Sequence, residues 1–177
     1  DGKIEAIKFA RNNKIPFLGI CYGMQMAIIE FARNQLNLRN ATSSEFDKKG
    51  LPIIGLINEW KKDGKTIKGT DKDLGGTMRL GSYDAKLKEN SMINKIYKKN
   101  LIKERHRHRY EVNIAYKEKF EKNGMIFSGL SPDGELPEII ELKNHPWFIG
   151  VQFHPEFKSR PLAPHPLFSS FIKASKN

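Results

Sequence analysis

The sequence contains a single cysteine, Cys21, so it cannot form an intrachain disulfide bond. No apolar run approaches the roughly 18–20 residues of a membrane-spanning helix, and no secretory signal pattern is visible. These absences are typical of a protein from a reducing compartment, so we expect a cytoplasmic protein with no membrane partner. The chain begins at Asp1 rather than at Met, and we expect it to be a piece of a longer protein.

The chain carries a net charge of +11, from 31 Lys and Arg against 20 Asp and Glu. Such a charge can indicate an acidic partner, nucleic acid included. However, the lysines are scattered, and the one dense basic cluster, residues 105–109, has no interleaved aromatic side chains to stack on bases. We therefore favour a solvated basic surface and predict no nucleic-acid partner. The 177 residues fit one domain, residues 1–177, with a core that needs no disulfides.

The first third of the chain indicates the fold class. An amphipathic helix over residues 1–13 precedes an apolar strand, Ile15–Ile20, and a second helix over residues 23–34. A fully apolar strand between helices favours a parallel sheet that is covered on both faces. We predict an α/β fold of flavodoxin-like type, with a doubly wound, mostly parallel sheet and helices on both faces. Such a fold also implies a strand before residue 1.

The rest of the chain reads as shorter elements. Residues 36–50 are expected to be irregular, 51–57 a short strand or helical turn, and 61–76 a charged, glycine-rich surface loop. We then expect a small antiparallel hairpin at 77–81 and 84–87, a helix at 91–98 capped by Ser91, a strand at 104–110 and a helix at 116–122. Strands at 125–130, 138–142 and 148–153 and a helix from about 165 to 174 complete the prediction.

Cys21 lies between a predicted strand and a predicted helix, within Gly19-Ile20-Cys21-Tyr22-Gly23. Strand, tight turn and helix with a reactive residue at the turn is the pattern of a nucleophile elbow. The glycines suit a turn that leaves no room for a Cβ. The helix N-terminus would favour the thiolate, and the Tyr22 N–H would face a developing oxyanion. The alternative is a buried structural cysteine.

A second pattern, Gln152-Phe153-His154-Pro155-Glu156, follows the last predicted strand. A histidine held by a carboxylate can act as a general base whose tautomer is fixed. Residues that follow parallel strands gather at the carboxyl edge of the sheet, so Cys21, His154 and Glu156 are candidates for one catalytic set. Considered alone, His154 beside Glu156 would more often be a surface pair.

Together, Gly19–Gln25 and Gln152–Glu156 resemble the class I (triad) glutamine amidotransferases. Longer stretches resemble the CTP synthase family within that class: Gly23–Asn34, Gly75–Gly81, Glu104–Asn113 and Asn144–Phe148. The resemblance implies that Cys21 attacks the side-chain amide of L-glutamine, that His154 transfers protons and that Glu156 orients His154. It also implies a set of glutamine- and oxyanion-binding residues, with no metal among the ligands: Tyr22, Gly23, Met24, Gln25, Glu45 and Arg109.

The resemblance further implies the setting of this chemistry. No cofactor is expected in this domain, whereas the full enzyme would use ATP and Mg, with GTP as activator. Ammonia would pass to a synthetase domain of the same polypeptide, which aminates UTP to CTP and assembles a homotetramer. Residues 77–81 are a candidate contact for that domain or for the activating nucleotide.

Two features depart from the family pattern. Tyr22 stands where these enzymes usually carry Leu, which alters a pocket wall, and the family's glycine-rich oxyanion loop would lie upstream of residue 1. Two alternatives stay open: a glutaminase of another synthetase, of GMP or carbamoyl-phosphate type, and a catalytically silent module of the same fold. The stretch Glu104–Asn113 argues against the first, and the intact Cys21, His154 and Glu156 argue against the second.

Overall fold

The structure is a computed structural model that describes residues 2–56, 61–62, 65–66 and 78–176. Its helices are α1 (Gly2–Asn12), α2 (Tyr22–Asn34), α3 (Met92–Tyr97), α4 (Lys117–Lys122) and α5 (Pro166–Ser175), with 3-10 turns η2 (Ile114–Tyr116) and η3 (Pro155–Lys158). Its strands are β1 (Phe17–Ile20), β2 (Ala41–Ser43), β3 (Leu51–Leu56), β4 (Lys61–Lys62), β5 (Lys65–Thr66), β6 (Arg79–Leu87), β7 (Leu101–His108), β8 (Tyr110–Val112), β9 (Met125–Leu130), β10 (Pro137–Leu142) and β11 (Phe148–Val151).

The main sheet has the strand order β1-β11-β10-β9-β6-β7. Only β1 and β11 pair in parallel among these described strands; the other neighbours are antiparallel. The α/β class is confirmed, but the sheet is mixed rather than mostly parallel. Residues 131–136 link β9 to β10 and residues 143–147 link β10 to β11, and such short links join antiparallel strands, since a parallel crossover takes about a dozen residues or more.

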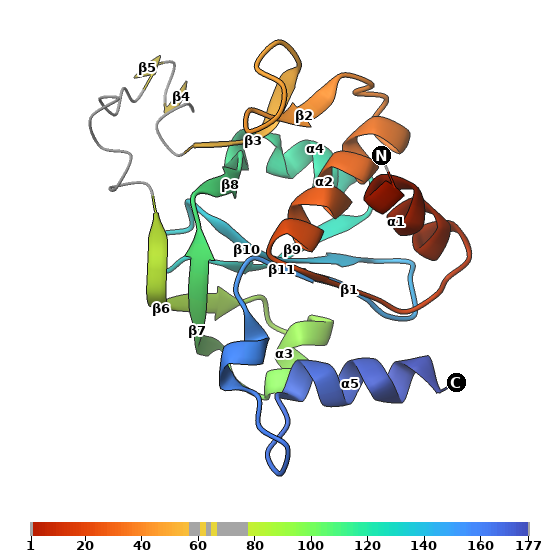
Figure 1. Cartoon of the computed structure of the whole chain (residues 1–177), viewed down its shortest axis with the longest axis vertical. Helices are drawn as coiled ribbons and strands as arrows, with labels where there is room; N and C mark the ends of the chain where they lie inside the picture. The colour runs from red at the N-terminus through yellow and green to blue at the C-terminus, as the bar shows by residue number, and fades with distance from the viewer. Residues whose placement is uncertain (1, 57–60, 63–64, 67–77, 177) are drawn as a thin grey trace.

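Helices cover both faces of this sheet, as the sequence predicted (Figure 1). Helices α1, α2 and α4 lie on one face, and α3 and α5 lie on the other. Each face has its own apolar core, and adjacent residues of one strand serve different cores: Ile140 packs in the first and Ile139 in the second. Because both faces are apolar, the parallel strands β1 and β11 read as short continuous hydrophobic runs.

A second, three-stranded sheet, β2-β3-β8, lies beside α2 and α4 (Figure 1). The residues of β2 were expected to be irregular, and those of β3 were expected to form a short strand or a helical turn, of which the structure shows the strand. The predicted hairpin at 77–87 is wrong, because β6 is one continuous strand that pairs with β7 from Arg79 to Lys86. Gly81 adopts a positive φ of 108° within that strand without reversing the chain. The predicted loop at 61–76 lies outside the described residues except for the β4–β5 ladder.

Helix ends follow the local sequence. The Ser91 hydroxyl accepts a hydrogen bond from the Asn94 N–H at 3.2 Å, which confirms the predicted cap of α3. Gly124, with φ 99°, follows α4. Within the described part of the chain, the structure contains no helix that is both long and apolar enough to span a membrane.

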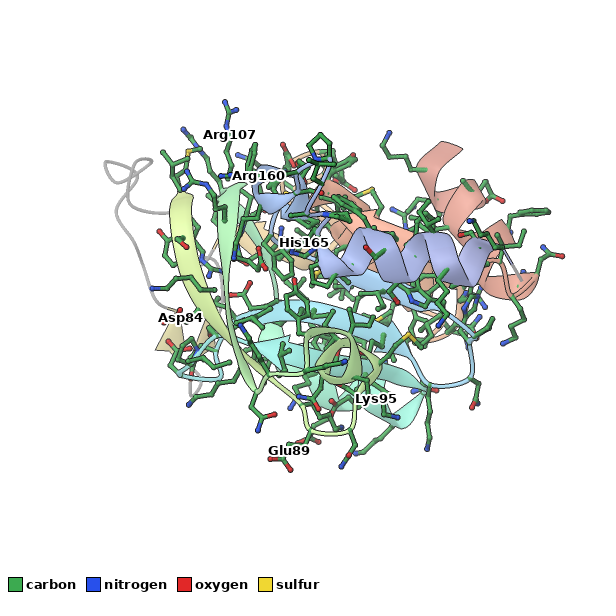
Figure 2. The ribbon with its side chains drawn as sticks, turned by 90° about the horizontal axis from the view of Figure 1, so that it is seen from below. Asp84, Glu89, Lys95, Arg107, Arg160 and His165 are labelled. Carbon is green, nitrogen blue, oxygen red and sulfur yellow. The ribbon has the colours of Figure 1, made fainter. Side chains whose placement is uncertain are left out.

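A buried polar cluster ties α3 and α5 to β7. The Tyr97 hydroxyl donates to Glu104 Oε1 at 3.0 Å, and His165 Nε2 lies 3.1 Å from the same oxygen. His165 stands at the start of α5, where its ring also caps the helix by accepting the Leu167 N–H (Figure 2). Burial and the nearby Glu104 raise the pKa of Tyr97 far above its usual value, so its hydroxyl stays a donor.

Candidate active site

The chain turns sharply between β1 and α2. Cys21 occupies the turn with φ 49° and ψ −101°, a positive φ that residues other than glycine rarely adopt. A Cβ at Gly19 would lie 2.8 Å from the carbonyl carbon of Gly23, so only glycine fits there. At Gly23 itself a Cβ would meet nothing within 4 Å, so the expected steric requirement holds for Gly19 alone. The turn presents Cys21 at the edge of the sheet as a nucleophile elbow.

The parallel pair β1–β11 brings the two predicted catalytic segments together. Ile20 lies opposite Val151, and the Cys21 N–H donates to the Val151 carbonyl at 2.7 Å. His154 follows Val151 within a few residues, and its Nδ1 lies 2.6 Å from Glu156 Oε1. His154 Nε2 is buried and has no hydrogen-bond partner among the described residues, which leaves it available as a base.

A cleft of about 240 Å³ opens beside Cys21. Its walls include five residues that the sequence predicted and three that it did not: Cys21, Tyr22, Gln25, Glu45 and Arg109, then Arg107, His108 and Tyr110. The side chain of Met24 is fully buried in the core, so a role for Met24 or Gly23 remains a prediction for their backbone only. His154 and Glu156 are not among the lining residues.

The missed residues belong to β7, β8 and the segment after β11. Side chains alternate strictly along β7, so His108 is buried and Arg107 is exposed at the end of the strand (Figure 2). That alternation is visible in the sequence as Glu104-Arg105-His106-Arg107-His108 and could have indicated His108. Gln152 lies outside the lining, but its side-chain Nε2 is 3.6 Å from Cys21 Sγ.

Comparison with known proteins identifies the family. The family model "Glutamine amidotransferase class-I" matches residues 1–174. The chain belongs to this family. It is 91% identical over 177 residues to a CTP synthase of Pelagibacter ubique and 62% identical over 176 residues to one of Zymomonas mobilis. The two matches include 100% and 99% of this chain, but only 33% and 32% of the length of the two relatives. The chain thus spans about a third of these curated relatives.

Solved structures agree. The structure titled "Trypanosoma brucei CTPS - glutaminase domain with bound acivicin" is 37% identical, with a TM-score of 0.86, over 99% of this chain and 66% of that one. A Thermotoga maritima glutamine amidotransferase, 13% identical with a TM-score of 0.52, covers 87% of this chain and 46% of its own. This second likeness shows the fold alone.

The thiol of Cys21 is not preformed as a thiolate. Burial, with smaller contributions from the carboxylates of Glu111 and Glu156, raises the pKa of Cys21 to about 11. Hydrogen bonds from the Tyr22 N–H and the Gln152 side chain act in the opposite direction but do not prevail. The N–H of Tyr22 at the helix N-terminus does favour the thiolate, as expected, but desolvation outweighs it, so the thiol of the free protein stays protonated. A nucleophilic role for Cys21, as the sequence predicted, would therefore need a base.

A buried ionic cluster lies behind the cleft. Arg79 Nη1 is 2.7 Å from Glu138 and 3.3 Å from Glu111, and His106 Nδ1 is 2.9 Å from His108 Nε2. Burial raises the pKa of Glu111 to about 8 and that of Glu138 to about 7, while burial and Arg79 lower the pKa of His106 to about 2 and that of His108 to about 3. Arg79 is turned inward and cannot serve as the surface contact expected at 77–81, where residue 77 lies outside the described part.

The cluster does not form a metal site. Among the residues that the structure describes, no group of three or more His, Cys, Asp or Glu is placed to hold an ion. The two histidines are held neutral and bonded to each other, so they stabilise the wall of the cleft on which His108 lies.

Proposed function

We propose that this chain is the glutaminase domain of a CTP synthase, which hydrolyses L-glutamine to glutamate and ammonia. One observation carries the proposal: Cys21, at a strained strand–helix turn, follows β1 beside the strand that leads to the His154–Glu156 pair. The identity of 91% to a CTP synthase supports the setting.

The cleft suits the two charged groups of the amino-acid end of glutamine. Glu45 is an anion for the α-ammonium group, and its turn is fixed by the bond from its N–H to Ser43 Oγ at 3.2 Å. Arg109 presents a guanidinium that can bind the α-carboxylate with two hydrogen bonds. The amide nitrogen of Gln25 donates to Tyr110 and to Gln152 within the protein, so its carbonyl oxygen is the atom that can accept a hydrogen bond from the substrate.

The reaction then proceeds in two halves. Cys21 Sγ attacks the side-chain amide carbon while His154 Nε2 takes the thiol proton, and the Tyr22 N–H supports the oxyanion. His154 returns that proton to the departing nitrogen, which leaves as ammonia and gives a γ-glutamyl thioester. His154 next deprotonates a water molecule that attacks the thioester, and glutamate leaves as the thiol re-forms. Glu156 holds the imidazole tautomer and stabilises the imidazolium throughout.

The ammonia would serve a synthetase domain of the same polypeptide, which aminates UTP to CTP with ATP and Mg and responds to GTP. The full enzyme would be a cytoplasmic homotetramer assembled through that domain. The support for a further domain is that the curated relatives are CTP synthases about three times as long as this chain.

The test uses the full-length enzyme and its Cys21→Ala variant. We expect the wild type to release ammonia from glutamine and the variant to release none, while CTP formation from added ammonium chloride persists in both. A glutamine-like diazoketone should label Cys21 in the wild type, as mass spectrometry would show. Equal ammonia release by the two proteins would refute the proposal.

A further inference from the structure

Gln152 is held immediately behind the nucleophile. It follows β11, is fully buried, and its backbone N–H donates to the Glu138 carbonyl at 2.8 Å. Its side-chain Nε2 lies 3.6 Å from Cys21 Sγ, within hydrogen-bonding range for sulfur. The preceding residue, Val151, accepts the Cys21 N–H, so the same strand end contacts both the backbone and the side chain of Cys21.

A chain of contacts fixes which end of the Gln152 amide faces the sulfur. The carbonyl of Tyr110 can only accept a hydrogen bond, so the Gln25 atom 2.9 Å from it must be the amide nitrogen. That nitrogen also lies 3.2 Å from the Gln152 amide, which must therefore present its oxygen to Gln25. The NH₂ group of Gln152 is left facing Cys21 Sγ.

We propose that Gln152 is a further catalytic residue, whose amide N–H stabilises the Cys21 thiolate as the base removes its proton and keeps Sγ in place for attack. This role rests on the proposed glutaminase function. A donor gains more from a thiolate than from a thiol, because hydrogen bonds to an ionised acceptor are about twice as strong. A neutral amide does so without adding a buried charge beside Cys21.

The charged groups around Cys21 Sγ show why the thiolate needs a hydrogen-bond donor. Glu111 on β8 and Glu156 on η3 both disfavour the thiolate. The other titratable groups near the nucleophile are His154 just before η3 and those on the cleft walls: Tyr22 on α2, Glu45 after β2, Arg107 and His108 on β7, Arg109 before β8 and Tyr110 on β8. Among the described residues, the donors that act on the sulfur itself are the Tyr22 N–H and Gln152.

The experiment measures alkylation of Cys21 by iodoacetamide against pH in the full-length enzyme, by mass spectrometry of the Cys21 peptide. Gln152→Met keeps the length of the side chain and removes the donor. We expect alkylation of this variant at fixed pH below the thiol pKa to be about tenfold slower. Its glutamine kcat should fall by about the same factor with little change in KM, and ammonia-dependent CTP formation should be unaffected. Gln35→Met, at an exposed position after α2, is the matched control and should behave as the wild type.

A second variant guards against misfolding, since Gln152 is buried. Gln152→Glu preserves the shape and replaces the NH₂ by oxygen, so an ionised Glu at this position should slow alkylation further. If Gln152→Met and Gln152→Glu both fold and their Cys21 is alkylated at the same rate as in the wild type at every pH, the inference is overturned. The alkylation readout does not depend on turnover, so it stays informative even if Cys21→Ala shows that the glutaminase proposal fails.

Discussion

The backbone N–H of His154 donates a hydrogen bond of 2.8 Å to the carbonyl oxygen of Arg105 on β7. Lys158, at the end of η3, adds a second tie through its ammonium group, which lies 2.6 Å from the Lys103 carbonyl and 3.7 Å from Glu104. The turn that carries His154 and Glu156 is thus attached to β7 at both ends. Its orientation depends on a strand that contributes no triad residue.

Replacement of Lys158 should therefore affect turnover. We expect Lys158→Met to lower the glutamine kcat several-fold, because η3 loses one attachment, while KM for glutamine stays nearly constant. Steady-state ammonia release measures both. Lys158→Arg should recover most of the rate, and Lys173→Met, exposed on α5, should leave it unchanged. A Lys158→Met enzyme with wild-type kcat would show that the backbone bond of His154 suffices.

Arg79 should be essential for stability. Above pH 8, where both carboxyls are ionised, its removal leaves Glu111 and Glu138 buried without their cation, and breaking a buried ion pair typically costs about 3–5 kcal/mol. We expect Arg79→Met to lower the free energy of unfolding in urea by about that amount, and Arg39→Met, at an exposed position, to change it little. Adding Glu138→Gln to Arg79→Met should restore part of the lost stability. If it restores none, the loss does not come from the unpaired carboxylate of Glu138.

The same cluster predicts a dependence of stability on pH. Glu111 and Glu138 have folded pKa values raised to about 8 and about 7 from 4.5, so their contribution is complete below pH 4.5 and is lost as the pH rises through 7 to 8. His106 and His108 have folded pKa values lowered to about 2 and 3 from 6.5, so theirs is complete above pH 6.5 and is lost as the pH falls towards 3.

Between pH 4.5 and 6.5 the two effects oppose each other, so thermal unfolding should show its highest midpoints there. The midpoint should fall between pH 6.5 and 8, and the Glu138→Gln variant should show a smaller fall in that window. A wild-type midpoint that rises from pH 6.5 to 8 would contradict the assignment of raised carboxyl pKa values.

The two glycines of the elbow should respond differently to alanine. A Cβ at Gly19 would lie 2.8 Å from the backbone of Gly23, so Gly19→Ala must displace α2 and should cost about 1–3 kcal/mol. Gly23→Ala adds a methyl group where nothing lies within 4 Å and should leave the folding free energy the same or slightly more favourable. Urea unfolding of the two variants provides the comparison, and equal destabilisation would contradict the close approach of the two backbones.

Local patterns made much of this fold predictable. The apolar stripe of α2, the cap at Ser91 and the stop at Gly124 are encoded within a few residues of where they act. The direction of strand pairing is not local: β1 pairs with β11, which lies near the other end of the chain, and β6 reads as a hairpin because Gly81 interrupts it. Pairing with β7 keeps that strand continuous.

The candidate site also has a part that local sequence indicated and a part that depends on distant contacts. Spacing and neighbours indicated Cys21, His154 and Glu156, and the family resemblance indicated Glu45 and Arg109. The raised pKa of Cys21 could not be read from the sequence, because it depends on burial by distant segments. The same holds for Gln152, whose role follows from contacts with residues far away along the chain.

The positive φ of Cys21 has a consequence for how this position can evolve. A non-glycine residue in that conformation costs on the order of 1–3 kcal/mol, whereas glycine adopts it freely. Selection for thermal stability alone should therefore favour glycine at position 21, at the expense of the thiol. Under the proposed function, folding and catalysis therefore favour different residues at position 21, and the rest of the domain supplies the stability that this turn gives up.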